Sequence, residues 1–381
     1  MSTLTMTEAG AALPAPPPQR GRKAGLDQDS LFAVAAFAGP ALLLFAAFIV
    51  LPLLLALGAT FTNHRLMSPE PTQFVGLENY RRLLSVDVVT VDALRGNAGA
   101  ALRDEDGLRF PTWRQVRLAH PELAGYREAF HLRVGERRLV LAATDPQFYR
   151  SLINTFLFAL LVLPLQCGSA LGMALLVNQK IRGRIFFRTV YFAPVVTSMV
   201  VASIVWSIML NTDRGLVNEV LRALSGDPNT GPDWLGDSLF ALPAIAVMSA
   251  WQGMGFQMLV FLAGLQSIPH EQYEAAILMG ANAWQRFVHV TLPGLRNTIV
   301  FVLVSTALLA FGLFTQVDVM TGGGPLDSTT TVVYHSVRTG FREQDIGYGS
   351  TIALVFFGLV LALSTLQRLV AAKGAAKGAA K

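Results

Sequence analysis

Two amide side chains, Gln252 and Gln257, stand in an apolar stretch of the sequence where few polar groups are expected. The stretch reads WQGMGFQMLVFLAGLQSIP and contains no Asp, Glu, Lys or Arg. A polar side chain in such a stretch is costly unless it has a role, and an amide can exchange hydrogen bonds with a hydroxylated solute. It can also bond a neighbouring helix as part of packing. The sequence leaves both roles open for these glutamines.

Catalytic and metal-binding chemistry has no comparable support in the residue pattern. The single cysteine, Cys167, lies in an apolar run and is expected to be a small core residue. The sequence contains no G-x-x-x-x-G-K-[ST] phosphate loop, so we expect this chain neither to cradle ATP in that way nor to act as an enzyme. No metal or bound cofactor is expected either, because the histidines are scattered over different loops: His64, His120, His131, His270, His289 and His335.

A second segment, EQYEAAILMGANAWQRFVHVTLPG (Glu271–Gly294), is short, rich in small residues and only mildly amphipathic. Its first half predicts a helix, and a second short helix follows and ends at Pro293. Gly280 can form a left-handed turn between them. The apolar face of the first helix suits a groove in another protein, although a helical hairpin on the bilayer surface fits the pattern equally well. This face consists of Tyr273, Ala276, Ile277 and Gly280.

Both segments belong to a chain with the composition of a membrane protein. Of its 381 residues, 52% are hydrophobic and only 14% are charged, and the mean hydropathy is +0.47. Soluble proteins carry about 25% charged residues. A soluble helical core would need charges on its outward faces, whereas six long stretches lack Asp, Glu, Lys and Arg, and about 20 apolar residues suffice to span a bilayer. We therefore expect an all-α polytopic membrane protein with spans at Leu31–Thr62, Ser151–Gln179, Thr189–Thr212, Ser238–Pro269, Asn297–Val317 and Ile346–Gln367.

The distribution of Lys and Arg predicts which ends of the spans face the cytoplasm. The long loop 63–150 exceeds the length to which this rule applies. Of the other Lys and Arg residues, 13 lie in the N-terminal tail, the loop after span two, the stretch Glu271–Arg296 and the C-terminus, against four in the two remaining loops, which places both termini in the cytoplasm. The net charge of +5 is interpreted as loop charge, and no nucleic acid is expected as a partner. The C-terminal KGAAKGAAK should form a frayed tail that is attracted to anionic membrane lipid.

These predictions divide the chain into five segments. The first is a disordered cytoplasmic tail, and the long loop after the first span is extracytoplasmic. The remaining spans form a core that includes the cytoplasmic loop 270–294. The predicted segments are the tail 1–30, the first span 31–62, the outer loop 63–150, the core 151–371 and the C-terminal tail 372–381.

The outer loop contains an arginine-rich insert at residues 86–144. DEDG (Asp104–Gly107) predicts a turn, and EAFHLRVGERRLVLAA (Glu128–Ala143) predicts a hairpin about Gly135–Glu136. We expect a small extracytoplasmic α+β subdomain. Whether it contacts another protein or only decorates the loop stays open.

The segment YEAAILMGANAWQRFVHVTLP resembles the EAA motif of the permease subunits of binding-protein-dependent ABC importers. Three more stretches are similar to the carbohydrate-uptake branch of that family, which includes the maltose and glycerol-phosphate permeases. They are VMTGGGPLDSTTTVVYHSVRTGF (Val319–Phe341), FVGLENYRRLL (Phe74–Leu84) and SLINTFLFAL (Ser151–Leu160). The positions that match the EAA motif are Glu274, Ala275, Ala276, Gly280, Leu292 and Pro293.

The resemblance implies a type I ABC importer permease in a bacterial cytoplasmic membrane. Such a permease forms half of a translocation pathway for a sugar or oligosaccharide and works by alternating access. Its partners would be a second permease subunit, an extracytoplasmic solute-binding protein and two ATPase subunits, which bind ATP and Mg²⁺. The EAA loop, with Tyr273 beside the motif, would dock into a cleft of an ATPase subunit. The alternative is an ion-coupled secondary transporter, but that class usually carries ionisable residues within its spans.

The same resemblance implies a substrate site in spans four and five. Positions that match Gln252, Gly253 and Phe256 face the sugar in the maltose permease, and Gln257 follows them on the same helix. The maltose permease has asparagines at the positions of Ala310 and Leu313, so maltose itself is not implied as the substrate. The span-five positions concerned are Thr306, Leu309, Ala310 and Leu313.

Overall fold

The computed structural model describes residues 28–69, 71–94, 103–104, 107–179 and 182–379. The chain divides into two compact units, Met1–Leu55 and Ala56–Lys381. The described residues are mostly helical, and two small antiparallel β-sheets, one of three strands and one of the two short strands β2 and β3, lie in the predicted insert. Most of the predicted N-terminal tail, residues 1–27, lies outside the described residues.

The first apolar run of the sequence forms a helix with a single π-helical turn in it. The helix begins at Gln28, three residues before the predicted span, and contains Pro40. It stays free of charged residues from Leu31 onward, which is the condition for crossing a hydrocarbon layer. Its parts are α1 (Gln28–Phe45), the π-turn η1 (Ala46–Val50) and α2 (Leu51–Ala59).

The predicted insert forms a three-stranded antiparallel sheet with strand order β1-β5-β4. The hairpin between β4 and β5 turns at Gly135, where φ is +62°, in agreement with the predicted turn. Helix α4 covers one face of the sheet, and Val91, Val116 and Val140 form the small core between them. The elements are β1 (Val86–Asp92), β2 (Arg103–Asp104), β3 (Gly107–Leu108), α4 (Trp113–Ala119), the 3-10 turn η2 (Pro121–Leu123), β4 (Arg127–Val134) and β5 (Arg137–Ala143).

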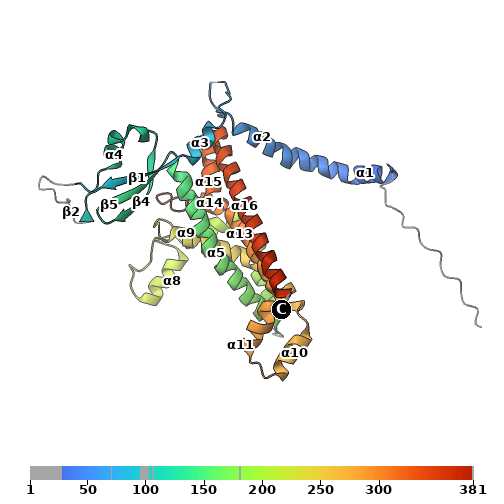
Figure 1. The fold of residues 1–381 in the computed structure, drawn as a ribbon. Coiled ribbons are helices and arrows are strands. Elements are labelled where there is room, and N and C mark those ends of the chain that lie inside the picture. The colour runs from blue at the N-terminus through green and yellow to red at the C-terminus, as the bar shows by residue number, and fades with distance from the viewer. Residues whose placement is uncertain (1–27, 70, 95–102, 105–106, 180–181, 380–381) are drawn as a thin grey trace, which may run out of the picture. The chain divides into compact units, whose positions relative to one another are not determined.

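Among the described residues, four helices are long and apolar enough to cross a membrane, or up to six if each of two bent helix pairs is one span. Helix α5 begins after Asp145, whose carboxylate accepts a hydrogen bond from the Phe148 N–H and so caps the helix. Helix α9 packs along α5 and is the most enclosed of the four (Figure 1). The three long helices of the second unit are α5 (Pro146–Asn178), α9 (Ala241–Gln266) and α16 (Ile346–Ala379).

The third predicted span, Thr189–Thr212, is not a straight helix. Helices α6 (Arg184–Val196) and α7 (Met199–Met209) meet at 99°. Pro194 lacks the N–H that would continue the hydrogen-bond ladder, and the backbone at Thr197 is extended. The predicted span therefore consists of two helices in the structure, because a count of apolar residues does not detect a bend.

The fifth predicted span also differs from the structure. Helix α13 (Arg296–Phe311) ends before Gly312, six residues earlier than predicted, and lies at 67° to the helical segment Ala283–Gly294. A separate short helix, α14 (Thr315–Met320), covers the rest of the predicted span.

The last helix is longer than predicted. Helix α16 continues to Ala379, through residues that were expected to form a frayed tail, because alanine has the highest helix propensity of all residues. The remaining elements are α3 (Glu78–Leu84), α8 (Leu216–Ser225), α10 (His270–Leu278), α11 (Ala283–Arg286), the π-turn η3 (Phe287–Thr291), α12 (Leu292–Gly294), α15 (Val332–Val337) and the π-turn η4 (Arg338–Arg342).

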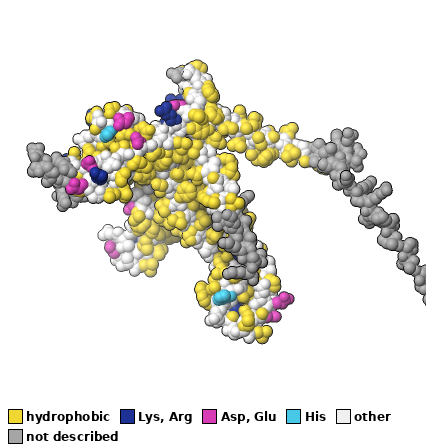
Figure 2. All heavy atoms as spheres, viewed as in Figure 1, with side chains coloured by type: hydrophobic (Ala, Val, Ile, Leu, Met, Phe, Trp, Pro, Cys, Tyr) yellow, Lys and Arg dark blue, Asp and Glu magenta, His cyan; other side chains and the backbone are white. Residues whose placement is uncertain are grey.

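Two buried apolar clusters hold the helices of the second unit together. The larger one joins α5, α7, α9, α13 and α16 around Phe158, Ile245 and Phe311. The smaller one joins the C-terminal halves of α5 and α9 to the start of α13 at Leu295. In Figure 2, hydrophobic side chains cover the helices that lie between the insert and the α10–α11 loop. Charged side chains gather on the insert and at the α10–α11 end.

Candidate functional site

A cavity of about 470 Å³ lies between α5, α9, α13 and the α6–α7 bend. Helix α9 contributes Ser249 and four predicted residues at i, i+1, i+4 and i+5, which share one helical face. The structure thus brings together every residue predicted from spans four and five: Gln252, Gly253, Phe256, Gln257, Thr306, Leu309, Ala310 and Leu313.

A hydrogen-bonded chain crosses three helices at the wall of this cavity. Gln166 Nε2 on α5 donates to Gln257 Oε1 on α9 over 2.8 Å. Gln257 Nε2 in turn donates to Thr306 Oγ1 on α13 over 3.0 Å. Both ends of the Gln257 amide are therefore bonded within the protein, which favours the packing role for this residue.

Gln166 was missed by the sequence analysis, although the signal that singled out Gln252 applies to it. It is an amide in an uncharged stretch of α5, and it lines the cavity. Its position depends on Gly253, because a Cβ at residue 253 would lie 2.2 Å from Gln166 Nε2. Gly253 thus acts by allowing close approach of the amide.

The groups that remain available for a solute are Gln252 and Phe256. The Gln252 side chain is half-buried and makes no hydrogen bond to the described residues, and the Phe256 ring is 50% exposed. At another part of the wall, Gln316 Nε2 donates to Ser249 Oγ over 3.4 Å. The residues that line the cavity include no Asp, Glu, Lys, Arg or His. A free amide and an aromatic face in an uncharged cavity suit a neutral solute with hydroxyl groups.

The Glu271–Gly294 segment forms two short helices on either side of Gly280, as predicted. Gly280 has φ +79°, and nothing lies within 4 Å of a Cβ added there. The requirement for glycine is therefore conformational and not steric. Helix α11 starts with a capping box, in which the side chains of Asn282 and Gln285 each accept a hydrogen bond from the other's backbone N–H.

The face of α10 that was expected to point outward is turned partly inward. Tyr273 OH lies 3.0 Å from Thr291 Oγ1 in η3, and Ala276 is buried. The exposed apolar residues of the loop are instead Leu278, Met279 and Trp284, together with Ile277. This prediction was wrong in part, because the helical period identifies a face but not the side on which its own loop folds back.

The other residues of the EAA match lie on the exterior of the loop. Glu274 and Ala275 are exposed, and Glu274 Oε1 is 3.7 Å from His270 Nε2. Leu292 and Pro293 begin α12 after η3, with Leu292 half-buried and Pro293 exposed. A hollow of about 440 Å³ lies between the two arms of the loop, beside Gly280.

At the opposite end of α5, the Asp145 carboxylate joins three elements. It accepts hydrogen bonds from Tyr348 OH on α16 over 2.6 Å and from His335 Nε2 on α15 over 3.1 Å. Burial alone would raise the pKa of Asp145, but the bond and charge of His335, the Tyr348 hydroxyl and the Phe148 N–H together lower it to about 2. Asp145 therefore stays ionised and holds these elements together.

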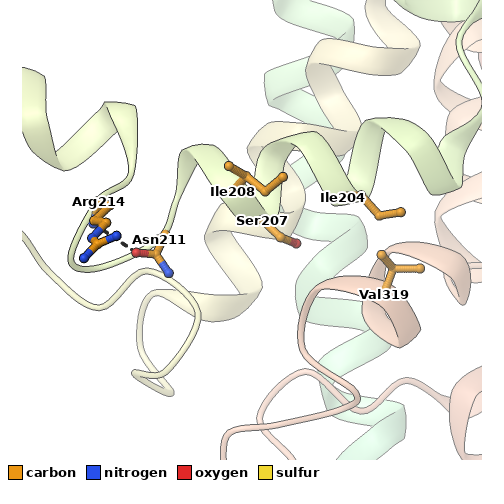
Figure 3. Close-up of a pocket in the computed structure, with 6 residues that line it drawn as sticks. All are labelled: Ile204, Ser207, Ile208, Asn211, Arg214 and Val319. Atoms are coloured by element: carbon orange, nitrogen blue, oxygen red, sulfur yellow. Dashed lines mark hydrogen bonds between the residues drawn. The ribbon is translucent and has the colours of Figure 1, made fainter.

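A further hollow of about 460 Å³ lies at the end of α7 and shares no residue with the cavity (Figure 3). Ile204 and Ile208 of α7 and Val319 of α14 line it, and Asn211 Oδ1 accepts a hydrogen bond from the Arg214 N–H at its edge. Its lining residues include no aromatic side chain, so this hollow does not resemble a second solute site.

Comparison with known proteins gives a consistent result. Residues 166–373 match the family described as binding-protein-dependent transport system inner membrane component. The probable ABC transporter permease protein YurN of Bacillus subtilis is 34% identical over 236 residues, which cover 61% of this chain and 80% of YurN. The trehalose/maltose transport system permease protein MalF of Thermococcus litoralis is 32% identical over 231 residues, which cover 61% of this chain and 77% of that protein.

A solved structure supports the fold independently. The crystal structure of a bacterial ABC transporter involved in the import of the acidic polysaccharide alginate aligns with a TM-score of 0.60 and 18% identity, covering 91% of this chain and 97% of the matched chain. The likeness extends over almost the whole chain, so the arrangement of helices is that of an ABC importer permease. These matches do not support the alternative of an ion-coupled secondary transporter. The chain belongs to the family of binding-protein-dependent transport system inner membrane components, the permease subunits of ABC importers.

Proposed function

We propose that this chain forms half of the translocation pathway of an ATP-driven importer for a neutral sugar or oligosaccharide. The observation that carries the proposal is the uncharged cavity, in which Gln252 and Phe256 are the exposed polar and aromatic groups. A sugar binds through its hydroxyl groups and through stacking on an aromatic ring, and both contacts are available here. The relative named as a trehalose/maltose permease agrees with this substrate class.

The proposed topology has six spans, with each bent helix pair counted as one span. Both termini and the α10–α12 loop then face the cytoplasm, and the insert at residues 86–144 lies outside. Outside the long loop 63–150, Lys and Arg concentrate in the segments assigned to the inside, which supports this orientation.

The proposed partners are a second permease subunit, two ATPase subunits and an extracytoplasmic solute-binding protein. ATP and Mg²⁺ would bind to the ATPase subunits, and this chain would bind no cofactor. The α10–α12 loop would dock on an ATPase subunit through the exposed side chains of Leu278, Met279 and Trp284. Closure of the ATPase pair would then move α9 and α13, which flank the loop and line the cavity.

The test is reconstitution in lipid vesicles with the permease, ATPase and binding-protein subunits encoded beside this chain. We expect uptake of a radiolabelled neutral oligosaccharide that requires internal ATP and the binding protein. Gln252→Ala should reduce uptake, while Ser207→Ala, in the separate hollow on α7, should not. Uptake by this chain alone, driven by an ion gradient without ATP, would contradict the proposal.

A further inference from the structure

A second cavity, of about 600 Å³, lies far from the translocation cavity, where the insert meets the N-terminal end of α5. The start of β4 forms one wall, and α15, η4 and the start of α16 form the other. The two cavities share no lining residue. Whereas the translocation cavity has no charged lining residue, this one is lined by three arginines and four carboxylates: Arg82, Arg127, Arg150, Glu128, Asp145, Asp327 and Glu343.

All four carboxylates already have partners within the protein. Glu128 bonds Arg138 and lies 2.7 Å from His131. Arg338 pairs with both Asp327, at 3.8 Å, and Glu343, at 3.3 Å. Asp145 has the three donors described above. Each of these acids is therefore already bonded to a group of the protein itself.

Among the residues that the structure describes, two of the three arginines have no acidic partner. Arg82 pairs with Asp345 at 3.4 Å and stacks on the Tyr348 ring. Arg150 bonds only the backbone oxygen of Ala129, at 3.4 Å, and the Arg127 side chain bonds none of the described residues. Arg127 and Ala129 both belong to β4, so Arg150 of α5 reaches the strand that carries Arg127, and both arginines line the cavity. They offer planar, charged donors that match a carboxylate.

The opposite wall has two buried polar atoms without a partner. His335 Nδ1 and Thr339 Oγ1 are both shielded from solvent and make no hydrogen bond to the described residues. The Thr339 hydroxyl can donate or accept a hydrogen bond, and the free ring nitrogen of His335 can take part in one as well. A hydroxyl group both donates and accepts hydrogen bonds, so the hydroxyl groups of a ligand would satisfy both atoms.

We propose that this cavity binds a small hydroxylated carboxylate, with its carboxylate on Arg127 and Arg150 and its hydroxyl groups toward His335 and Thr339. The four acids in the lining would repel a doubly charged anion such as phosphate more strongly than a single carboxylate. A ligand there would join the insert to the helical core at a position outside the translocation pathway. The site goes beyond the proposed transport function and does not depend on it.

Calorimetric titration of the purified full-length chain in detergent with sodium D-glucuronate tests the proposal. At constant ionic strength, we expect saturable binding of glucuronate that is about tenfold or more tighter than that of D-glucose, acetate or inorganic phosphate. Arg127→Gln and Arg150→Gln should each weaken glucuronate binding about tenfold. Arg117→Gln, an exposed arginine of α4 outside the cavity, is the matched control and should change nothing.

Two further variants separate this site from the rest of the protein. Thr339→Val should weaken glucuronate binding but not change the weak binding of acetate, which lacks hydroxyl groups. Leu309→Trp, which places a large side chain in the translocation cavity, should leave glucuronate binding intact. Equal affinities for glucuronate and glucose, unchanged binding in both arginine variants, or loss of binding in Leu309→Trp would each overturn the proposal. Because no ATPase subunit takes part, a failure here leaves the transport proposal standing.

Discussion

Gln166 and Gln257 are 91 positions apart in the sequence, and their side-chain amides meet at 2.8 Å between α5 and α9. This contact continues to Thr306 on α13, so three helices that line the translocation cavity share one polar chain. Polar side chains within a membrane bond neighbouring helices because no water is present there to bond them instead. These hydrogen bonds therefore hold the three helices in place at the wall of the cavity, where the amide of Gln252 and the ring of Phe256 remain available for a solute.

The Gln166 contact should be measurable as a coupling energy. Gln166→Ala leaves the buried Gln257 oxygen without its donor, which costs about 1–3 kcal/mol. Gly253→Ala should act on the same contact, since its Cβ would lie 2.2 Å from Gln166 Nε2. In thermal unfolding of the purified protein, the double variant should lose less than the sum of the two single losses.

A glycine on α5 provides the control for this comparison of single and double variants. A Cβ at Gly172 meets nothing within 4 Å, so Gly172→Ala should not lower the unfolding temperature. Additive losses in Gln166→Ala and Gly253→Ala would mean that the two residues act independently, against the geometry seen here.

Substitutions at the free groups of the cavity should affect transport more than stability. Gln252→Ala and Phe256→Ala remove half-buried side chains, and each should raise the KM for oligosaccharide uptake about tenfold through a lost hydrogen bond or stacking contact. Their unfolding temperatures should stay close to that of the parent protein. Initial rates of uptake into vesicles provide the measurement, and an unchanged KM in both variants would place the sugar elsewhere.

The turn at Gly280 should be required for coupling to ATP hydrolysis. A valine at φ +79° is strained by about 1–2 kcal/mol, so Gly280→Val should rearrange the α10–α11 turn. We expect membrane insertion to persist and binding-protein-stimulated ATP hydrolysis to fall at least tenfold.

Gly226 offers a matched control for the Gly280 variant. It has φ +71° after α8, and its added Cβ also meets nothing within 4 Å, so Gly226→Val introduces a similar strain outside the loop. ATP hydrolysis should remain normal in that variant. If both variants lost hydrolysis equally, backbone strain in general would explain the effect and the docking role of the loop would fail.

The hydrogen bonds of the Asp145 carboxylate predict that the folded protein loses stability in acid. The folded protein lowers the pKa of Asp145 from 3.8 to about 2, so the ionised carboxylate stabilises the fold. This contribution, on the order of 2 kcal/mol, is complete above pH 3.8 and disappears as the pH falls through 2. Unfolding temperatures measured from pH 6 down to pH 2 should converge for the parent protein and Asp145→Asn.

An exposed acid tests whether that convergence is specific. Asp213 is exposed and its side chain has no partner among the described residues, so Asp213→Asn should follow the parent protein at every pH. A constant difference between the parent and Asp145→Asn across the whole range would show that the charge of Asp145 does not stabilise the fold.

The sequence by itself determined the class of protein and most of the candidate site. Uncharged apolar runs identified the long helices α5, α9 and α16, because crossing a hydrocarbon layer depends on composition and length. The four α9 residues could be predicted because they lie within one helix, where the spacing along the chain dictates a shared face. The α10–α11 turn at Gly280 followed from the same local rules.

Only the tertiary structure decided which distant residues meet. Gln166 joins the cavity through the packing of α5 on α9, and no local spacing records that contact. The spacing of apolar residues does not record what a helix packs against. It therefore could not predict the bend between α6 and α7 or the inward turn of Tyr273. The cavity between β4, α5 and α15 likewise arises from segments far apart in the chain, because charges become paired or stay unpaired only when their neighbours in space are known.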